Sequence, residues 1–143
     1  MSADSAGERV SVALPAGSVE VSVETQGPKD PWATVIVAHG AGAGYRHPFL
    51  LGFSRGMREL GVATVRFNFP YVEAGRRMPG PAAHAIATWG AVSTFARAFA
   101  GDGPVFASGK SYGGRMASMA AAEHAIDPAG LRKIGRASCR ERV

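Results

Sequence analysis

A run of apolar and β-branched residues, Ala33–Ala38, leads directly into the glycine-rich segment His39–Gly44. A strand with no polar face must be covered on both sides, as happens in the middle of a parallel sheet. Further strands are expected at 62–67 and 104–108, each also rich in apolar residues. Together these segments predict the centre of a parallel sheet with helices on both faces.

Helical spacing of apolar residues predicts three helices, at 48–60, after Pro81 and at 114–124. In the first, the expected buried face is formed by Phe49, Phe53, Met57 and Leu60. Residues 9–14 and 18–24 alternate apolar and polar side chains around Pro15-Ala-Gly17, which predicts a hairpin of edge strands with one wet face. The order β-β-β-α-β-α-β-α indicates an α/β fold, a three-layer sandwich with a mostly parallel sheet.

The last ten residues, 134–143, match codon for codon the in-frame translation of a common sequencing-library adapter. We therefore expect 1–133 to be the N-terminal portion of one domain and 134–143 to be a non-native tail, with Lys133 at the junction also suspect. Three arginines and one glutamate lie in that tail, so the formal charge falls from +5 to +3 without it. This modest charge gives no reason to expect a nucleic-acid partner.

The single cysteine, Cys139, also lies in the tail, so we expect no disulfide, cysteine metal site or thiol nucleophile in the body. No apolar run approaches the roughly 18 residues needed to cross a bilayer, and the first residues lack the features of a signal peptide. The expectations are a cytoplasmic protein with no membrane partner, no metal and no cofactor.

The segment "SGKSYGGRM" at 108–116 fits two motifs. A phosphate-binding loop needs a glycine five residues before Gly109, but Pro104 stands there and has no N–H to donate. Gly-x-Ser-x-Gly fits better, because it lies between a strand and a helix, where a sharp turn would present Ser111 as a nucleophile. Gly109 and Gly113 are expected to flank that turn, with Gly114 allowing the helix to pass close to the sheet.

The glycine-rich segment 39–44 follows a neighbouring strand, so it should lie at the same edge of the sheet as Ser111. Backbone N–H groups of Gly40 or Ala41 could join that of Tyr112 in stabilising an oxyanion. A flexible strand-to-helix connection is the simpler alternative. The spacing does not fit a dinucleotide-binding fingerprint, because Tyr45 and His47 occupy the positions where a third glycine is required.

The segments "HGAGAG", "HPF", "RFNFPY" and "GKSYGGRMAS" together resemble the α/β-hydrolase superfamily, and within it the KANL3/Tex30-like hydrolase branch. The resemblance covers about residues 10–132. It implies that Ser111 is the catalytic nucleophile, that Gly40 or Ala41 and Tyr112 form an oxyanion hole, and that an acid and a histidine follow later in the chain.

After Ser111 the chain offers only Glu123, His124 and Asp127 before the tail. A helix rises 1.5 Å per residue, so His124 would lie nearly 20 Å from the serine, too far to act as its base. We therefore expect the chain to be part of a longer hydrolase, inactive by itself, insoluble or molten, and with one central strand edge uncovered.

Several other residues have two interpretations. His39 and His47 are expected to anchor loops, and His84 to be solvated. Lys110 and the pair Arg76-Arg77 could attract an anionic substrate or simply be solvated, and the aromatic residues Tyr45, Phe69 and Tyr71 could line a pocket or pack in the core. The resulting hypotheses are a serine hydrolase of small-molecule esters, thioesters or amides, or a binding or scaffold module that keeps the fold without catalysis.

Overall fold

The computed structural model describes residues 7–123, 125–126 and 132–136, the last of these for the backbone alone. His124, Asp127 and residues 137–143, on which several of the expectations above depend, lie outside the described residues.

A six-stranded sheet forms the centre of the fold, in the order β1-β2-β4-β3-β5-β6. The strands are β1 (Glu8–Leu14), β2 (Gly17–Gln26), β3 (Ala33–Ala38), β4 (Val62–Phe67), β5 (Val105–Gly109) and β6 (Arg132–Arg136). β3 pairs in parallel with both β4 and β5, and β5 pairs in parallel with β6. The hairpin β1–β2 is antiparallel and joins the sheet through β4, so the sheet is mixed but parallel at its centre.

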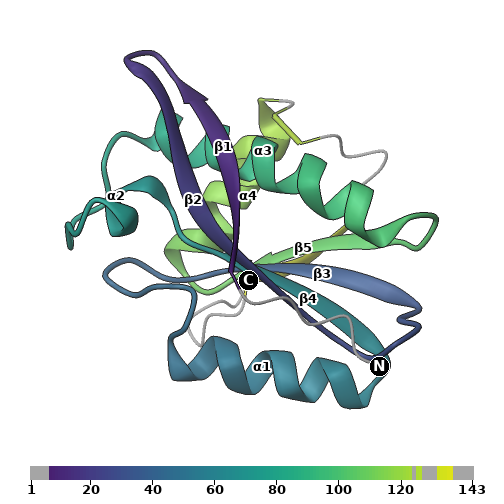
Figure 1. Cartoon of the computed structure of the whole chain (residues 1–143). Coiled ribbons are helices and arrows are strands. Elements are labelled where there is room, and N and C mark those ends of the chain that lie inside the picture. The colour runs from purple at the N-terminus through teal and green to yellow at the C-terminus, as the bar shows by residue number, and fades with distance from the viewer. Residues whose placement is uncertain (1–6, 124, 127–131, 137–143) are drawn as a thin grey trace.

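Helices cover both faces of this sheet, as the apolar central strands require (Figure 1). α1 (Pro48–Glu59) lies on one face, where a small core joins it to β3 and β4. α3 (Ala82–Ala100) and α4 (Tyr112–Ala122) lie on the other face, over the larger core, which includes the fully buried Trp89, Phe67 and Phe69. The three-layer α/β arrangement is therefore confirmed.

The central strands match their predicted positions closely, and every residue of β3 and β4 is buried. In α3, four of the five residues at the helical spacing after Pro81 are buried, namely Ile86, Trp89, Val92 and Ala96, and the fifth, Phe99, is partly buried. The pattern of apolar residues predicted the central strands and α3 correctly because these elements are enclosed by the rest of the fold. Each of their buried apolar residues therefore has a packing partner.

The predicted buried face of α1 is wrong in part. Leu50 and Ser54 are the buried residues of this helix, whereas Phe49 is 41% exposed and Leu60, just past its end, is 64% exposed. The Ser54 hydroxyl is tolerated in the core because it accepts a hydrogen bond from Thr64 at 2.9 Å. Serine is a polar residue, so the apolar pattern did not place Ser54 on the buried face, and the predicted orientation of the helix was wrong.

Three further details differ from expectation. β2 is an interior strand, because it pairs with β4 as well as β1, so β1 alone of the two hairpin strands lies at an edge of the sheet. A short helix, α2 (Pro70–Glu73), interrupts the long loop after β4. The edge of β5 that was expected to be open is paired with β6, whose residues 134–136 belong to the predicted tail.

Candidate active site

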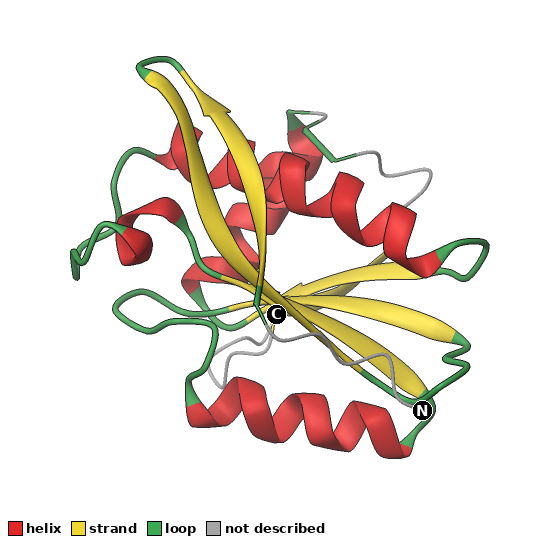
Figure 2. Ribbon diagram, in the orientation of Figure 1, coloured by secondary structure: helices red, strands yellow, loops and turns green. Residues whose placement is uncertain are grey.

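The loops that leave β3, β4 and β5 come together at the carboxyl edge of the sheet, on the left in Figure 2. β3 leads into the glycine-rich segment, β4 into α2, and β5 into Ser111 and α4. In open sheets with parallel strands this edge is where ligands bind.

Ser111 occupies a strained turn between β5 and α4. Its φ is 52° and its ψ is −109°, and it is the only residue other than glycine with a positive φ among those described. Such a conformation costs about 1–3 kcal/mol and persists only where the surroundings enforce it. Here the Lys110 N–H donates to the carbonyl of Ala38 at 3.0 Å, and the Gly113 N–H donates back to that of Lys110. The turn is thus held from both sides, and the Ser111 side chain is exposed.

The glycines on either side of Ser111 have no space for a side chain. A Cβ on Gly109 would lie 2.5 Å from the nitrogen of Gly114, and a Cβ on Gly113 would lie 2.5 Å from the carbonyl oxygen of His39. These contacts confirm the expected reason for Gly109 and Gly113. They also show that Gly114 contributes its backbone to the close approach between α4 and β5.

The glycine-rich segment and the Ser111 turn are in direct proximity. A Cβ on Gly40 would lie 3.4 Å from the carbonyl oxygen of Lys110 and 3.9 Å from the Cβ of Ser111. Tyr112 is the first residue of α4, so its N–H has no partner within the helix. The structure therefore brings the backbone of Gly40, and with it Ala41, next to Ser111 and Tyr112.

The segment after β4 fixes the glycine-rich loop in place. The Gly42 N–H donates to the phenol oxygen of Tyr71 at 3.1 Å, and the Tyr45 N–H donates to the side-chain oxygen of Asn68 at 2.9 Å. Arg66 donates to the carbonyl of Tyr45 at 2.8 Å. None of these anchoring roles was predicted, although all three anchoring residues belong to the "RFNFPY" motif.

Glu73 supports Asn68 in turn. Its carboxylate accepts hydrogen bonds from the Asn68 amide at 2.9 Å and the Ser22 N–H at 2.7 Å, and it also pairs with Arg9 at 3.3 Å. Burial raises the pKa of Glu73, but the hydrogen bonds from Asn68 and Ser22 and the charge of Arg9 outweigh burial and hold it below the usual value. The ionised form of Glu73 is thus part of the loop's support.

His39 has a structural role and is not placed to act as a base. It is fully buried, Nδ1 lies 2.8 Å from the Gly40 carbonyl, and Nε2 accepts from the Phe69 N–H at 3.2 Å. Because a carbonyl can only accept, the proton sits on Nδ1 and the ring is neutral. Burial lowers the pKa of His39, as this arrangement requires. The expectation that it holds loops together is confirmed.

The structure also places other residues for which the sequence left two interpretations, and Glu123. His47 caps α1 by accepting from the Phe49 N–H at 3.1 Å. The ammonium of Lys110 lies 5.5 Å from the centre of the Phe49 ring, which accounts for that exposed phenylalanine. The ring of Tyr45 lies beneath the guanidinium groups of Arg46 and Arg66. Glu123 caps the end of α4 and is exposed.

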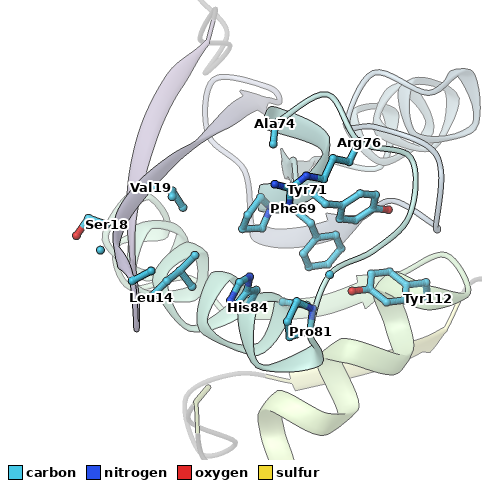
Figure 3. A pocket seen from close by; sticks show the side chains of 15 residues that line it. Leu14, Ser18, Val19, Phe69, Tyr71, Ala74, Arg76, Pro81, His84 and Tyr112 are labelled. Carbon is cyan, nitrogen blue, oxygen red and sulfur yellow. The ribbon is translucent and has the colours of Figure 1, made fainter.

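A cavity of about 330 Å³ lies beside this site, between the tip of the β1–β2 hairpin, α2 and the start of α3 (Figure 3). Tyr112 and Tyr71 form part of its wall, but Ser111 does not line it. Burial raises the pKa of both tyrosines, so both phenols remain protonated at neutral pH. Of the aromatic residues weighed above, Phe69 and Tyr71 thus both pack in the core and line a pocket, whereas Tyr45 does not.

Within the described residues, no group of three or more His, Cys, Asp or Glu side chains could hold a metal ion. No helix in the same part of the chain is long and apolar enough to span a bilayer.

Comparison with known families gives one match, to a model described as an alpha/beta hydrolase domain, over residues 31–135. A comparison with curated protein sequences gives no match. Among solved structures, the chain is similar to a serine hydrolase without a lid from Xanthomonas campestris, at 24% identity and a TM-score of 0.65, covering 82% of this chain and 56% of that one.

Two further structures have similar scores. The dienelactone hydrolase of Anabaena variabilis is 18% identical with a TM-score of 0.69, covering 88% of this chain and 60% of that one. An alpha-beta serine hydrolase homologue from Coxiella burnetii is 21% identical with a TM-score of 0.65, covering 81% and 57%. At these identities the likeness concerns the fold. The chain spans less than two thirds of the length of each of these three proteins.

Proposed function

Since the chain belongs to the alpha/beta hydrolase domain family, we propose that it is part of a serine hydrolase that cleaves esters, thioesters or amides of small molecules. The observation that carries this proposal is the conformation of Ser111, a strained residue between a parallel strand and a helix, next to the glycine-rich loop. A positive φ is uncommon for residues other than glycine, and residues strained in this way cluster at functional sites. A nucleophile at this position is presented away from the sheet.

In the proposed reaction, Ser111 Oγ attacks the substrate carbonyl carbon, and the carbonyl oxygen takes up negative charge. The N–H groups of Tyr112 and of Ala41 or Gly40 stabilise this oxyanion, helped by the positive end of the α4 dipole. The general base takes the hydroxyl proton of Ser111 and passes it to the leaving group as the carbon–leaving-group bond breaks, which gives an acyl-enzyme on Ser111. Water hydrolyses that ester and restores the serine.

The general base and its acid partner are proposed to come from a part of the parent protein beyond this chain. His39 has both ring nitrogens engaged, His47 caps the start of α1, and His84 lines the cavity, whose wall does not include Ser111. Without that base the 143-residue chain by itself should lack esterase activity, and because it spans less than two thirds of the structures it resembles, we also expect it to be insoluble or molten. A soluble, cooperatively melting chain with turnover would overturn this part of the proposal.

We place the protein, as the sequence indicated, in the KANL3/Tex30-like branch and in the cytoplasm, with a small-molecule substrate and no nucleic-acid or membrane partner. Sequencing the gene downstream of codon 132 tests the architecture. An Asp or Glu and then a His at the ends of later strands are expected.

The reaction itself is tested by labelling the parent protein with a fluorophosphonate probe. Labelling should occur in the wild type and disappear in Ser111→Ala. Absence of labelling in a folded protein with an intact acid and histidine would contradict the hydrolase. It would instead favour a binding or scaffold module that has kept the fold without catalysis.

A further inference from the structure

We propose that the cavity beside Ser111 binds the end of the substrate remote from the reacting carbonyl, and that this end is an apolar group carrying a carboxylate. The inference rests on the proposed function for the identity of the reacting group. It goes beyond that function in naming a binding site and a substrate class.

The cavity has the size and character of a small-ligand site. Its volume of about 330 Å³ lies at the lower end of the range for such sites, which suits a compact molecule. Most of its lining is apolar and comes from three regions, namely the β1–β2 hairpin, α2 with its caps and the start of α3: Leu14, Ala16, Val19, Phe69, Pro70, Ala74, Pro81 and Ala85. A ligand that fills this cavity must therefore present carbon over most of its surface.

Of the described residues in the cavity wall, Arg76 is the one with a permanent charge. The imidazole of His84 lies in the same wall, to which no described aspartate or glutamate contributes. Arg76 has no ion-pair partner within the described residues, in contrast to Arg9, Arg46 and Arg66, which each pair with a glutamate. A guanidinium presents its N–H groups as a fork that matches a carboxylate.

The start of α3 adds a second source of positive potential. Pro81, His84 and Ala85 belong to its first turn or cap, and all three line the cavity. Pro81 makes no side-chain cap, and the first turn holds no acidic residue. A helix of 19 residues thus begins at the cavity wall with its N-terminal N–H groups uncapped by a side chain. An anion near this end would be stabilised by the helix dipole.

Two tyrosines belong both to the wall of the cavity and to the surroundings of Ser111. Tyr112 follows Ser111 directly and lines the cavity with its ring, while Tyr71 lines it and holds the glycine-rich loop. Their rings meet edge to face with centroids 6.3 Å apart. A substrate with its carbonyl at Ser111 would therefore extend past Tyr112 toward Arg76 and α3.

The first test measures binding without turnover, by titration calorimetry on the parent protein carrying Ser111→Ala. Phenylbutyrate and its neutral counterpart phenylbutanol are the probes. We expect the carboxylate to bind about tenfold more tightly, a factor typical of a charged hydrogen bond. Arg76→Gln should remove this preference, whereas Arg77→Gln, the neighbouring exposed arginine that does not line the cavity, should keep it.

The second test fills the apolar part of the cavity with a larger side chain. Ala74 lines the cavity yet is exposed, so Ala74→Phe should fold normally and weaken both probes by about tenfold. Equal affinity of the two probes, no binding, or an equal effect of Arg76→Gln and Arg77→Gln would each overturn the site.

The third measurement ties the site to Ser111. In the active parent protein, Arg76→Gln should lower kcat/KM about tenfold for the p-nitrophenyl monoester of adipic acid, and leave that of p-nitrophenyl hexanoate unchanged. An equal effect on both esters would overturn the role of Arg76 in substrate recognition. Failure of the hydrolase proposal would have a different result. The parent protein would then hydrolyse neither ester, but it would still bind phenylbutyrate more tightly than phenylbutanol.

Discussion

The phenol oxygen of Tyr71 accepts a hydrogen bond from the backbone N–H of Gly42 at 3.1 Å. This bond joins the loop after β4 to the loop after β3, and a Cβ placed on Gly40, two residues before Gly42, would come within 3.9 Å of the Cβ of Ser111. The position of the proposed oxyanion donors therefore depends on a side chain that need not touch the substrate's carbonyl.

Replacing Tyr71 with phenylalanine removes this acceptor and keeps the ring. We expect kcat of the parent protein to fall about fivefold to tenfold, with KM changed less, because the loop would stabilise the transition state more than the bound substrate. Steady-state kinetics with a neutral ester measure the effect. The matched control is Tyr45→Phe, since the Tyr45 ring lies under Arg46 and Arg66, and a phenylalanine ring can keep both interactions. Equal kinetic losses in the two variants would contradict a positioning role.

Alanine at Gly113 should destabilise the fold severely. The new Cβ would lie 2.5 Å from the His39 carbonyl oxygen and 2.6 Å from the Ala38 Cβ, neither of which belongs to a flexible side chain. A loss of about 3 kcal/mol in the free energy of unfolding is expected. Gly56→Ala is the control, because Gly56 is an exposed position in α1 with nothing within 4 Å of a new Cβ, and should gain about 0.5–1 kcal/mol. Urea denaturation of the parent protein distinguishes the two.

Glycine at position 111 should be more stable than alanine there. Both variants lack the nucleophile, but only glycine adopts a φ of 52° without strain. We expect Ser111→Gly to exceed Ser111→Ala by about 1 kcal/mol in chemical denaturation of the parent protein. If the two are equally stable, the strain at this turn is not what the backbone geometry indicates.

Acid should weaken the support of the glycine-rich loop through Glu73. The pKa of this carboxyl is lower in the folded state than its usual 4.5, so its contribution to stability is present above pH 4.5 and is lost as the pH falls through the folded value. Glu73→Gln should reduce stability at neutral pH by about 1 kcal/mol. It should also flatten the fall in stability below pH 4.5, as measured by denaturation at a series of pH values.

The exposed Glu59, at the end of α1, provides the comparison for that experiment. Glu59→Gln should leave the acid limb of the stability profile as it is in the parent protein. Parallel acid limbs in Glu73→Gln and the parent would show that Glu73 does not carry the effect.

Residues enclosed on all sides could be located from the sequence, and residues at the edges could not. Every residue of β3 and β4 is buried and most of them are apolar, so their composition was enough to locate both strands. In α1, by contrast, Ser54 is buried because Thr64 donates to it, and Phe49 stays exposed under Lys110. Both outcomes depend on partners from other parts of the chain, which a periodic pattern does not contain.

The same distinction applies to the candidate site. Ser111, Gly109 and Gly113 were recognisable because a sharp turn admits few residue types, and this requirement is local. The roles of Tyr71 and Asn68 were not recognisable, since a tyrosine and an asparagine after a strand fit many environments. Their nearness to the glycine-rich loop follows from the pairing of β3 with β4.

The turn at Ser111 also has a consequence for the order of folding. It is closed by contacts with Ala38 and His39, far back in the sequence, and not by neighbours within α4 alone. Such a turn cannot reach its final geometry while the chain has only local structure, because the loop between β3 and β5 must close first. The reactivity of Ser111 should therefore be acquired late in folding, which makes covalent labelling of this serine a kinetic marker for the joining of β3 and β5.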